Sequence, residues 1–231
     1  MNQLNHIAVI PDGNTRWAKV NGRSNFDGYS EGIQRGLELT RHTRQLGIHT
    51  TTFWGLSTEN WRHRPKAELD FLVRLFIKTM DDWLFEAQRD NVKIIHLGDK
   101  TRLPKRLLSK LAKVEAATAN NTQFVFNLAL DYGGQDEIMR ATRRLLADPK
   151  ADLHDPHELE LYLDTAGQPH PNPDLIIRTS GEQRLSGFMP WQSVYAELYF
   201  EPCLYPDFTT DKLDAAIADY YGRKRNFGGG H

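Results

Sequence analysis

The sequence predicts a single α/β domain over residues 1–231, built on a mostly parallel central sheet of about six strands flanked by helices. Three features of the chain indicate this fold. Short apolar runs alternate with amphipathic stretches along the whole chain, which is typical of βαβ units. Apolar residue types make up 39% of the 231 residues, enough for one layered core. The sequence contains no internal repeat and no long, compositionally biased linker that would divide it.

Six short runs are predicted as strands because each is apolar and is followed by glycine, proline or polar residues. These runs are His6–Ile10, Thr50–Leu56, Val92–Leu97, Phe124–Leu130, Leu175–Arg178 and Ala196–Phe200. Between them, apolar residues recur at helical spacing. The predicted helices are Ser30–Leu46, Pro65–Arg89, Lys105–Ala119, Gln135–Leu146 and Leu213–Tyr221. Right-handed crossovers would then cover both faces of the sheet and direct ligands to the carboxyl ends of the strands.

Charge and residue content limit the functions open to the chain. The 29 Lys and Arg residues against 30 Asp and Glu give a net charge of −1, which argues against nucleic-acid binding. The single Cys203 can form no intrachain disulfide and fits a reducing compartment. The nine histidines include no HxH or HExxH pair, which argues against a histidine zinc site. We expect a cytoplasmic protein, since neither a transmembrane segment of roughly 20 apolar residues nor a signal-peptide pattern is visible.

A glycine-containing turn follows the first predicted strand. Its residues are Asp12, Gly13, Asn14, Thr15, Arg16 and Trp17. Backbone N–H groups of such a turn can point at a phosphate, Arg16 adds charged donors, and Asp12 could carry Mg²⁺. The alternative is an ordinary Asp-Gly turn with a solvated arginine, because the spacing fits neither the P-loop nor the dinucleotide-binding pattern.

The second predicted strand also ends in polar residues beside a tryptophan. These residues are Ser57, Thr58, Glu59, Asn60 and Trp61. They could bind a ligand at the same edge of the sheet as Asp12. Alternatively, Ser57 caps a short helical turn and Trp61 belongs to the core.

The stretch after the strand Leu175–Arg178 is the richest in anion-binding residue types. Arg178 and Arg184 flank a small turn with hydroxyl groups, and Ser186 follows. Guanidinium groups bind phosphate through paired N–H donors, and an unpaired charge at the end of a buried strand would be costly. This pattern predicts an anion clamp, with a solvated loop as the alternative. Glu197 lies within an apolar stretch, so its carboxylate should be paired or bind a metal.

Taken together, the motifs resemble one protein family. HIAVIPDGNTRWAKVNG, LSTENW, LDYGG, DLIIRTSGEQRLSGF, WQSVYAELYF and YPDF occur in the order and spacing of the cis-prenyltransferases, the undecaprenyl diphosphate synthase family, from about His6 to Gly229. The resemblance implies Mg²⁺-dependent condensation of isopentenyl diphosphate with an allylic diphosphate to form a Z double bond. It further implies a homodimer, a hydrophobic product tunnel between sheet and helices, and a peripheral membrane contact for product release.

The resemblance also assigns residue roles by position. It implies that Asp12 and Glu197 bind Mg²⁺, and that Asp12 acts on the departing diphosphate. The residues expected at the allylic diphosphate are Gly13, Asn14, Thr15, Arg16 and Trp17. Those expected at isopentenyl diphosphate are Ser57, Thr58, Glu59, Asn60, Trp61, Arg178, Arg184, Leu185 and Ser186. Because an amide is a poor base, we expect Asn60 to orient the substrate while a diphosphate oxygen accepts the proton.

Five positions depart from the family pattern. Asn25 and Tyr29 stand where the allylic segment usually carries an arginine and a histidine, and we still expect both to face substrate. His63, expected at the same place, replaces an arginine but is flanked by Arg62 and Arg64. Gln183 and Asn226 replace a histidine and an arginine. The isopentenyl clamp is therefore intact, whereas the allylic side has lost cationic donors.

Three functions remain open on this reading. The first is a chain-elongating cis-prenyltransferase. The second is an irregular, branching or cyclising synthase of the lavandulyl type, which Tyr29 favours and Asn60 with Trp61 disfavours. The third is a non-catalytic partner subunit, which the presence of Asp12 and Glu197 disfavours. Gly55, small on the second strand, favours longer products, with a packing role as the alternative.

Overall fold

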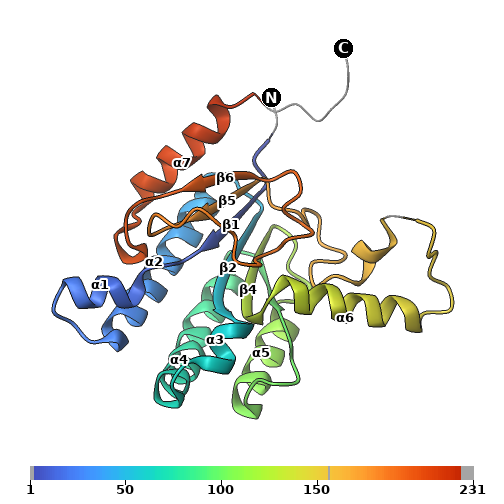
Figure 1. The fold of residues 1–231 in the computed structure, drawn as a ribbon, viewed down its shortest axis with the longest axis horizontal. Coiled ribbons are helices and arrows are strands. Elements are labelled where there is room, and N and C mark those ends of the chain that lie inside the picture. The colour runs from blue at the N-terminus through green and yellow to red at the C-terminus, as the bar shows by residue number, and fades with distance from the viewer. Residues whose placement is uncertain (1–2, 156, 225–231) are drawn as a thin grey trace.

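The strands form one sheet in which every pairing is parallel. In the computed structural model, which describes residues 3–155 and 157–224, the strand order is β3-β4-β2-β1-β5-β6 (Figure 1). The strands are β1 (His6–Ile10), β2 (Thr50–Ser57), β3 (Val92–Leu97), β4 (Phe124–Tyr132), β5 (Leu175–Arg178) and β6 (Glu197–Phe200). The predicted α/β fold with a six-stranded sheet is therefore confirmed. The Asn226 departure lies outside the described residues.

The helices include all those predicted and several short ones that were not. They are α1 (Asn14–Val20), α2 (Asn25–Gln45), α3 (Thr58–His63), α4 (Lys66–Arg89), α5 (Lys105–Thr118), α6 (Gly134–Ala147) and α7 (Thr210–Gly222), with 3₁₀ turns η1 (Glu158–Tyr162) and η2 (Tyr205–Asp207). Helix α2 begins before the predicted Ser30 because Ser24 caps it and forms a capping box with Asp27 in its first turn. Helices α1 and α3 span 7 and 6 residues, too few for a clear periodic pattern.

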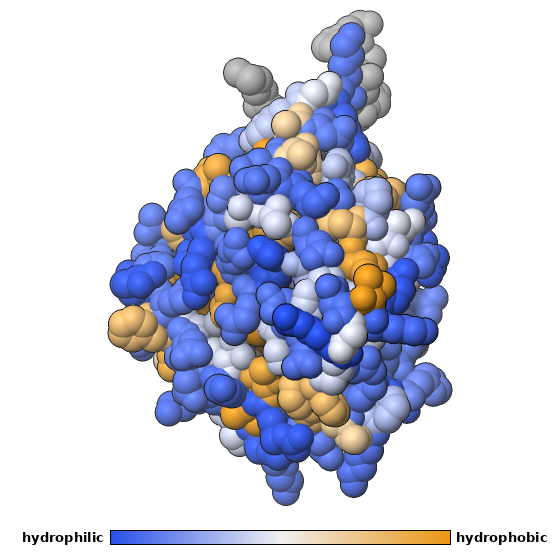
Figure 2. Space-filling view, turned by 90° about the vertical axis from the view of Figure 1, so that its left-hand side faces the viewer, coloured by the Kyte–Doolittle hydropathy of each residue, from blue (hydrophilic) through white to orange (hydrophobic). Residues whose placement is uncertain are grey.

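Two apolar clusters lie on opposite faces of the sheet because successive strand residues point to opposite sides. The larger one joins Ile7 and Val9 of β1 to buried residues of α2, α4, α5 and α7. The smaller one joins Ala8 and Ile10 to Phe188 of the segment between β5 and β6. No helix in the described part of the chain is long and apolar enough to cross a bilayer. The face in Figure 2 is mostly hydrophilic, with apolar residues in small, separate groups.

A buried polar group lies on the face of the smaller cluster, near the starts of the strands. His6 is fully buried, and its Nε2 lies 2.7 Å from Thr52 Oγ1. Asn127 donates to the same hydroxyl at 3.0 Å and exchanges hydrogen bonds with Gln168 at 2.9 and 3.1 Å. Burial lowers the pKa of His6 from 6.5 to about 3, so the imidazole is neutral in the folded protein.

This burial predicts a stability that falls on acidification. Between pH 6.5 and about 3 the unfolded chain binds a proton at His6 and the folded chain does not, so unfolding is favoured as the pH falls through that window. Between pH 7 and pH 5, His6 should lower the free energy of unfolding by about 2 kcal/mol. Urea unfolding at these pH values should therefore show a smaller loss in His6→Gln, which cannot titrate, than in the wild type. Equal losses in the two proteins would contradict the assignment.

Candidate active site

A cavity of about 400 Å³ lies at the carboxyl ends of β2, β1 and β5 and extends along the sheet. Its lining reaches from Asp12 and Ser57 at this edge to Phe126, which lies opposite Thr51 near the start of β2. The strand from Thr51 to Ser57 is about 20 Å long at about 3.3 Å per residue. The lining is polar at the carboxyl edge and apolar farther in, where Phe53, Leu72, Phe76, Trp83, Phe126 and Leu128 contribute.

Asp12 is the centre of the polar end. Its Oδ2 accepts from Arg178 Nη2 at 3.0 Å, and its Oδ1 accepts from Arg16 Nη2 at 3.1 Å. The hydroxyl of Thr179 donates to the Asp12 carbonyl at 2.7 Å, and Arg16 also donates to Ser180. Two cations therefore hold one carboxylate at the cavity, which accounts for an arginine at the end of the buried strand β5.

Arg178 organises the predicted anion clamp. Its Nη1 donates to Ser186 Oγ at 2.8 Å and to the Arg184 carbonyl, while its buried Nε has no hydrogen-bond partner in the described structure. The Arg184 side chain is exposed and pairs with Glu182, and Leu185 packs against the smaller apolar cluster. Arg178 and Ser186 thus line the cavity, whereas Arg184 and Leu185 do not. Arg178 therefore lines the cavity with a guanidinium that is already bonded to Asp12, Ser186 and the Arg184 carbonyl.

The residues after β2 combine a structural role with a place in the cavity wall. Ser57 is the N-cap of α3, since its Oγ accepts from Asn60 N at 3.0 Å, so the capping alternative is confirmed. Ser57, Glu59 and Asn60 also line the cavity. Thr58 is buried and Trp61 packs against the larger core; neither belongs to the lining. Capping and ligand binding are therefore compatible at Ser57.

Helix α1 begins directly after the first glycine turn. Gly13 precedes it with φ 109°, a left-handed conformation that suits glycine. Gly13, Asn14 and Thr15 line the cavity, and the buried Asn14 Oδ1 has no hydrogen-bond partner among the described residues. Trp17 is outside the lining and donates from Nε1 to Asp207 at 2.8 Å. The turn thus presents backbone and an amide to the cavity, while the tryptophan fixes α1 to η2.

The two departures on α2 are tied to one carboxylate. Tyr29 OH donates to Glu68 Oε2 at 2.7 Å, and Asn25 Nδ2 donates to Glu68 Oε1 at 3.1 Å. Tyr29 lines the cavity and Asn25 does not. Burial, followed by this hydrogen bond, raises the pKa of Tyr29 to about 12. The guanidinium of Arg64 lies 5.1 Å above the Tyr29 ring and lines the cavity, whereas His63 is exposed outside it, as is Gln183.

The two predicted metal ligands are not brought together in one chain. Glu197 pairs with Leu175 at the start of β5, whereas Ile10 pairs with Arg178 at its end, so Glu197 lies roughly 10 Å back along the strand direction. Its carboxylate accepts from Arg223 at 2.7 Å. Within the described ranges, no group of three or more His, Cys, Asp or Glu side chains could hold a metal. Asp12 alone suits Mg²⁺, which commonly uses one carboxylate, water and substrate phosphates.

Three residues that the sequence analysis did not assign to the site also line the cavity. Trp83, on the apolar stripe of α4, and Tyr205, in the YPDF motif, both line it. The sequence shows both the apolar stripe of α4 and the YPDF motif, but it does not show that the two line one cavity. Gly55 also lines the cavity, and a Cβ there would come 2.9 Å from Leu130 Cδ2 and 3.2 Å from Phe76 Cζ. The packing role of this glycine is therefore supported alongside its place in the wall.

A family described as putative undecaprenyl diphosphate synthase matches residues 10–228 of the chain. The chain belongs to this family. An isoprenyl transferase of Neisseria gonorrhoeae is 40% identical over 224 residues, covering 96% of this chain and 88% of the relative. An isoprenyl transferase of Streptococcus pneumoniae is 42% identical over 231 residues, covering 97% and 91%. The protein is thus a prenyl transferase, as its motifs predicted.

Solved structures of the family have the same fold. Lavandulyl diphosphate synthase from Lavandula x intermedia, in complex with dimethylallyl diphosphate, aligns with a TM-score of 0.92 and 36% identity, covering 98% of both chains. A probable undecaprenyl diphosphate synthase from Campylobacter jejuni aligns with a TM-score of 0.82 and 33% identity, covering 99% of this chain and 100% of the other. The fold does not separate a lavandulyl diphosphate synthase from a probable undecaprenyl diphosphate synthase, because both structures share it.

Proposed function

We propose that this prenyl transferase condenses isopentenyl diphosphate with an allylic diphosphate, in a Mg²⁺-dependent reaction, to give a Z-polyprenyl diphosphate. The observation that carries the proposal is the elongated cavity, which has Asp12 and Arg178 at one end and apolar side chains along the rest. Arg16 does not line it but is bonded to Asp12. A diphosphate with an isoprenoid tail has the same division into a charged head and an apolar chain. The polar end lies where parallel sheets usually bind ligands.

Cleavage of the allylic C–O bond separates a delocalised carbocation from a diphosphate anion. Mg²⁺ bound at Asp12 would neutralise charge on that leaving group. Arg16 and the backbone around Gly13 are suited to hold the anion at the start of α1. The apolar walls formed by Leu72 and Phe76 exclude water, which would otherwise add to the cation.

The new carbon–carbon bond requires the alkene of isopentenyl diphosphate to lie against the allylic carbon. Arg178 and Ser186, which line the cavity, are suited to bind its diphosphate, and Ser57 and Asn60 line the same space. After bond formation, the cation loses a proton to restore a double bond. Asn60 orients the substrate and a diphosphate oxygen takes the proton, because an uncharged amide is a poor base.

Four finer assignments stay predictions, and all of them except the cytoplasmic location rest on the family resemblance. These are Glu197 as a second metal ligand, the homodimer, the cytoplasmic location and a peripheral membrane contact for product release. For Glu197 the resemblance predicts a metal ligand, whereas within one chain its carboxylate is paired with Arg223. The use of the cavity as a product tunnel is supported by its apolar inner lining.

Irregular coupling is the second candidate. One observation favours it: Tyr29 lines the cavity where the family usually has a histidine. Incubation of the purified protein with labelled isopentenyl diphosphate, Mg²⁺ and each allylic diphosphate from C5 to C20 tests both candidates. A series of linear products lengthened by C5 units supports the first candidate, and a single branched or cyclic product supports the second. No incorporation with any primer would contradict both.

Removing the carboxylate at the centre of the site should abolish turnover. Asp12→Ala is expected to lower kcat by at least about 10²–10³-fold, because it removes the group on which metal and leaving-group stabilisation depends. Asp12→Asn, which keeps an oxygen acceptor for Arg178, should lose as much. Asp81→Asn, at an exposed ion pair with Lys110 on the helices, is the control and should keep full activity. Near-normal kcat in either Asp12 variant would refute this role.

Product length should depend on Trp83. The cavity ends against Trp83 and Phe126, and both side chains also line a second cavity of about 30 Å³ that continues between Thr40 and Glu86. Trp83→Leu would shorten this wall and join the two spaces. Its products should be at least one C5 unit longer, as read by chromatography of the dephosphorylated lipids. Phe85→Leu, on the same helix but 69% exposed, should leave the product distribution unchanged. Unaltered lengths in Trp83→Leu would contradict the assignment.

A further inference from the structure

The segment between β5 and β6 contributes Ser186 to the cavity but is held from the opposite side of the sheet. Phe188 is fully buried and stacks on Trp54 with ring centroids 4.9 Å apart. Its edge meets Tyr132 at 5.9 Å, and Trp54 Nε1 donates to the Tyr132 carbonyl at 3.0 Å. The cavity side and the anchored side of this short segment are thus two residues apart in the sequence.

The backbone of the segment is held in an unfavourable conformation. Ser186 has φ 51° and Met189 has φ 47°, in the left-handed region that residues with a Cβ seldom adopt. Such conformations persist where the surroundings impose them. One restraint is the hydrogen bond from Gly134 N to the Gly187 carbonyl at 2.8 Å. The approach is so close that a Cβ on Gly134 would lie 1.9 Å from Pro190 Cδ.

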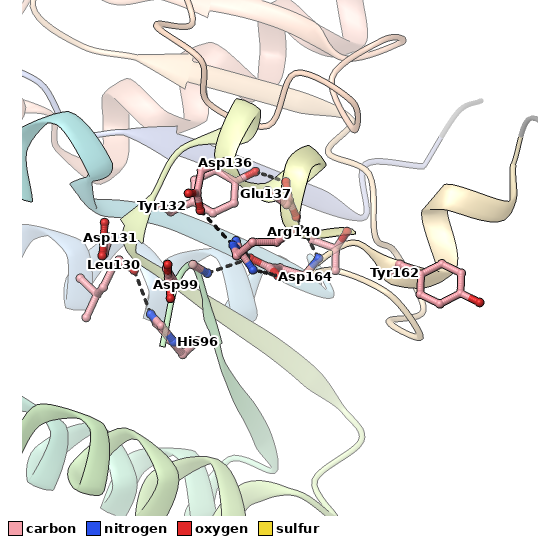
Figure 3. Close-up of polar contacts among 12 residues, drawn as sticks. His96, Asp99, Leu130, Asp131, Tyr132, Asp136, Glu137, Arg140, Tyr162 and Asp164 are labelled. Carbon is pink, nitrogen blue, oxygen red and sulfur yellow. Dashed lines mark hydrogen bonds and ion pairs between the residues drawn. The ribbon is translucent and has the colours of Figure 1, made fainter. Parts of the chain in front are cut away.

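A buried carboxylate on α6 supplies the second restraint. Gln192 Nε2, at the far end of the segment, lies 3.1 Å from each carboxylate oxygen of Glu137. Tyr132 OH donates to Glu137 at 2.5 Å, and Asp164 N donates to it at 2.9 Å. Figure 3 shows Tyr132 at the end of β4 facing Glu137, with Arg140 and Asp164 beside them. Glu137 is completely buried, and Gln192 is 2% exposed.

Arg140 and Asp164 extend this contact into a wider network. Arg140 binds Asp164 through two nitrogens, at 2.8 and 2.6 Å, and binds Asp136 at 2.9 Å. Asp164 in turn orders the backbone that donates to Glu137. Arg140 thus contacts Asp164 and Asp136, while the hydrogen bonds at Glu137 come from three uncharged donors: Tyr132 OH, Asp164 N and Gln192 Nε2. A carboxyl group buried in such a setting is costly unless its hydrogen bonds are made, so Glu137 and the segment that carries Gln192 depend on each other.

We propose that Glu137 and Gln192 are positioning residues for the isopentenyl diphosphate site. Gln192 fixes one end of the segment between β5 and β6. Arg178 binds the other end, since its Nη1 donates to Ser186 Oγ and to the Arg184 carbonyl. Those two acceptors hold Nη1 and thereby fix the orientation of the Arg178 guanidinium, which lines the cavity. Loosening the segment therefore misplaces two phosphate-binding groups without touching the allylic side. The proposal rests on the proposed function for the identity of the substrate.

A matched pair of variants tests this role. Gln192→Leu removes the anchoring donor at nearly constant volume. Gln168→Leu makes the same change at a glutamine bonded to Asn127, away from the segment. Hydrogen–deuterium exchange of the intact proteins, read in the peptide covering 183–195, should accelerate in Gln192→Leu and not in Gln168→Leu. This measurement needs no substrate, so it is independent of the proposed function.

Steady-state kinetics gives the second readout. The KM for isopentenyl diphosphate should rise about tenfold in Gln192→Leu, the size expected for a lost contact to a charged group. The KM for the allylic diphosphate should stay within about twofold, a split that a general loss of stability would not produce. If Gln192→Leu does not fold, Phe188→Leu, which thins the stack on Trp54, should show the same split.

The outcomes separate the inference from the function on which it rests. Unchanged exchange in the 183–195 peptide overturns the anchoring role, whatever the enzyme does. Faster exchange with equal shifts in both KM values overturns the positioning role and leaves only a structural one. Absence of turnover in the wild type would refute the proposed function, while exchange would still decide the anchoring.

Discussion

The buried guanidinium of Arg178 is the constraint on which the site depends. A charge that is 6% exposed at the end of an internal strand has to be met by nearby acceptors. Asp12 supplies one from the end of β1, and Ser186 and the Arg184 carbonyl supply two from the segment after β5. One side chain therefore fixes the relative position of segments that are 166 residues apart in the sequence. The polar end of the cavity is the result of satisfying that charge.

The parallel sheet determines where this can happen. In a parallel sheet all strands end at the same edge, so the residues after β2, β1 and β5 meet although they are distant in the chain. The helices on one face, especially α2 and α4, then continue the space along the sheet with apolar side chains. The polar end of the cavity is therefore formed by residues at the strand ends, and its apolar part is formed largely by the helix faces.

Much of this arrangement was predictable from the sequence, for definite physical reasons. The runs His6–Ile10, Val92–Leu97 and Leu175–Arg178 match β1, β3 and β5 because buried strands read as continuous apolar stretches. Strand register is not encoded locally, which is why Glu197 could be expected beside Asp12 although it lies at the other end of its strand. Glu137 was equally hidden, since an acidic residue in the first turn of a helix usually reads as exposed.

The two residues of α2 that depart from the family pattern carry no positive charge, and a neighbouring arginine supplies one at the cavity. Asn25 and Tyr29 offer no cation, and both donate to Glu68, whose pKa the hydrogen bond from Tyr29 lowers. The cation at this part of the cavity is Arg64, from the junction of α3 and α4, held over the face of the Tyr29 ring. The tyrosine therefore helps to hold the Arg64 guanidinium at the cavity. Because Tyr29 contacts both Glu68 and Arg64, replacing Tyr29 alters the surroundings of the other two, and the effects of these residues on substrate binding will not be additive.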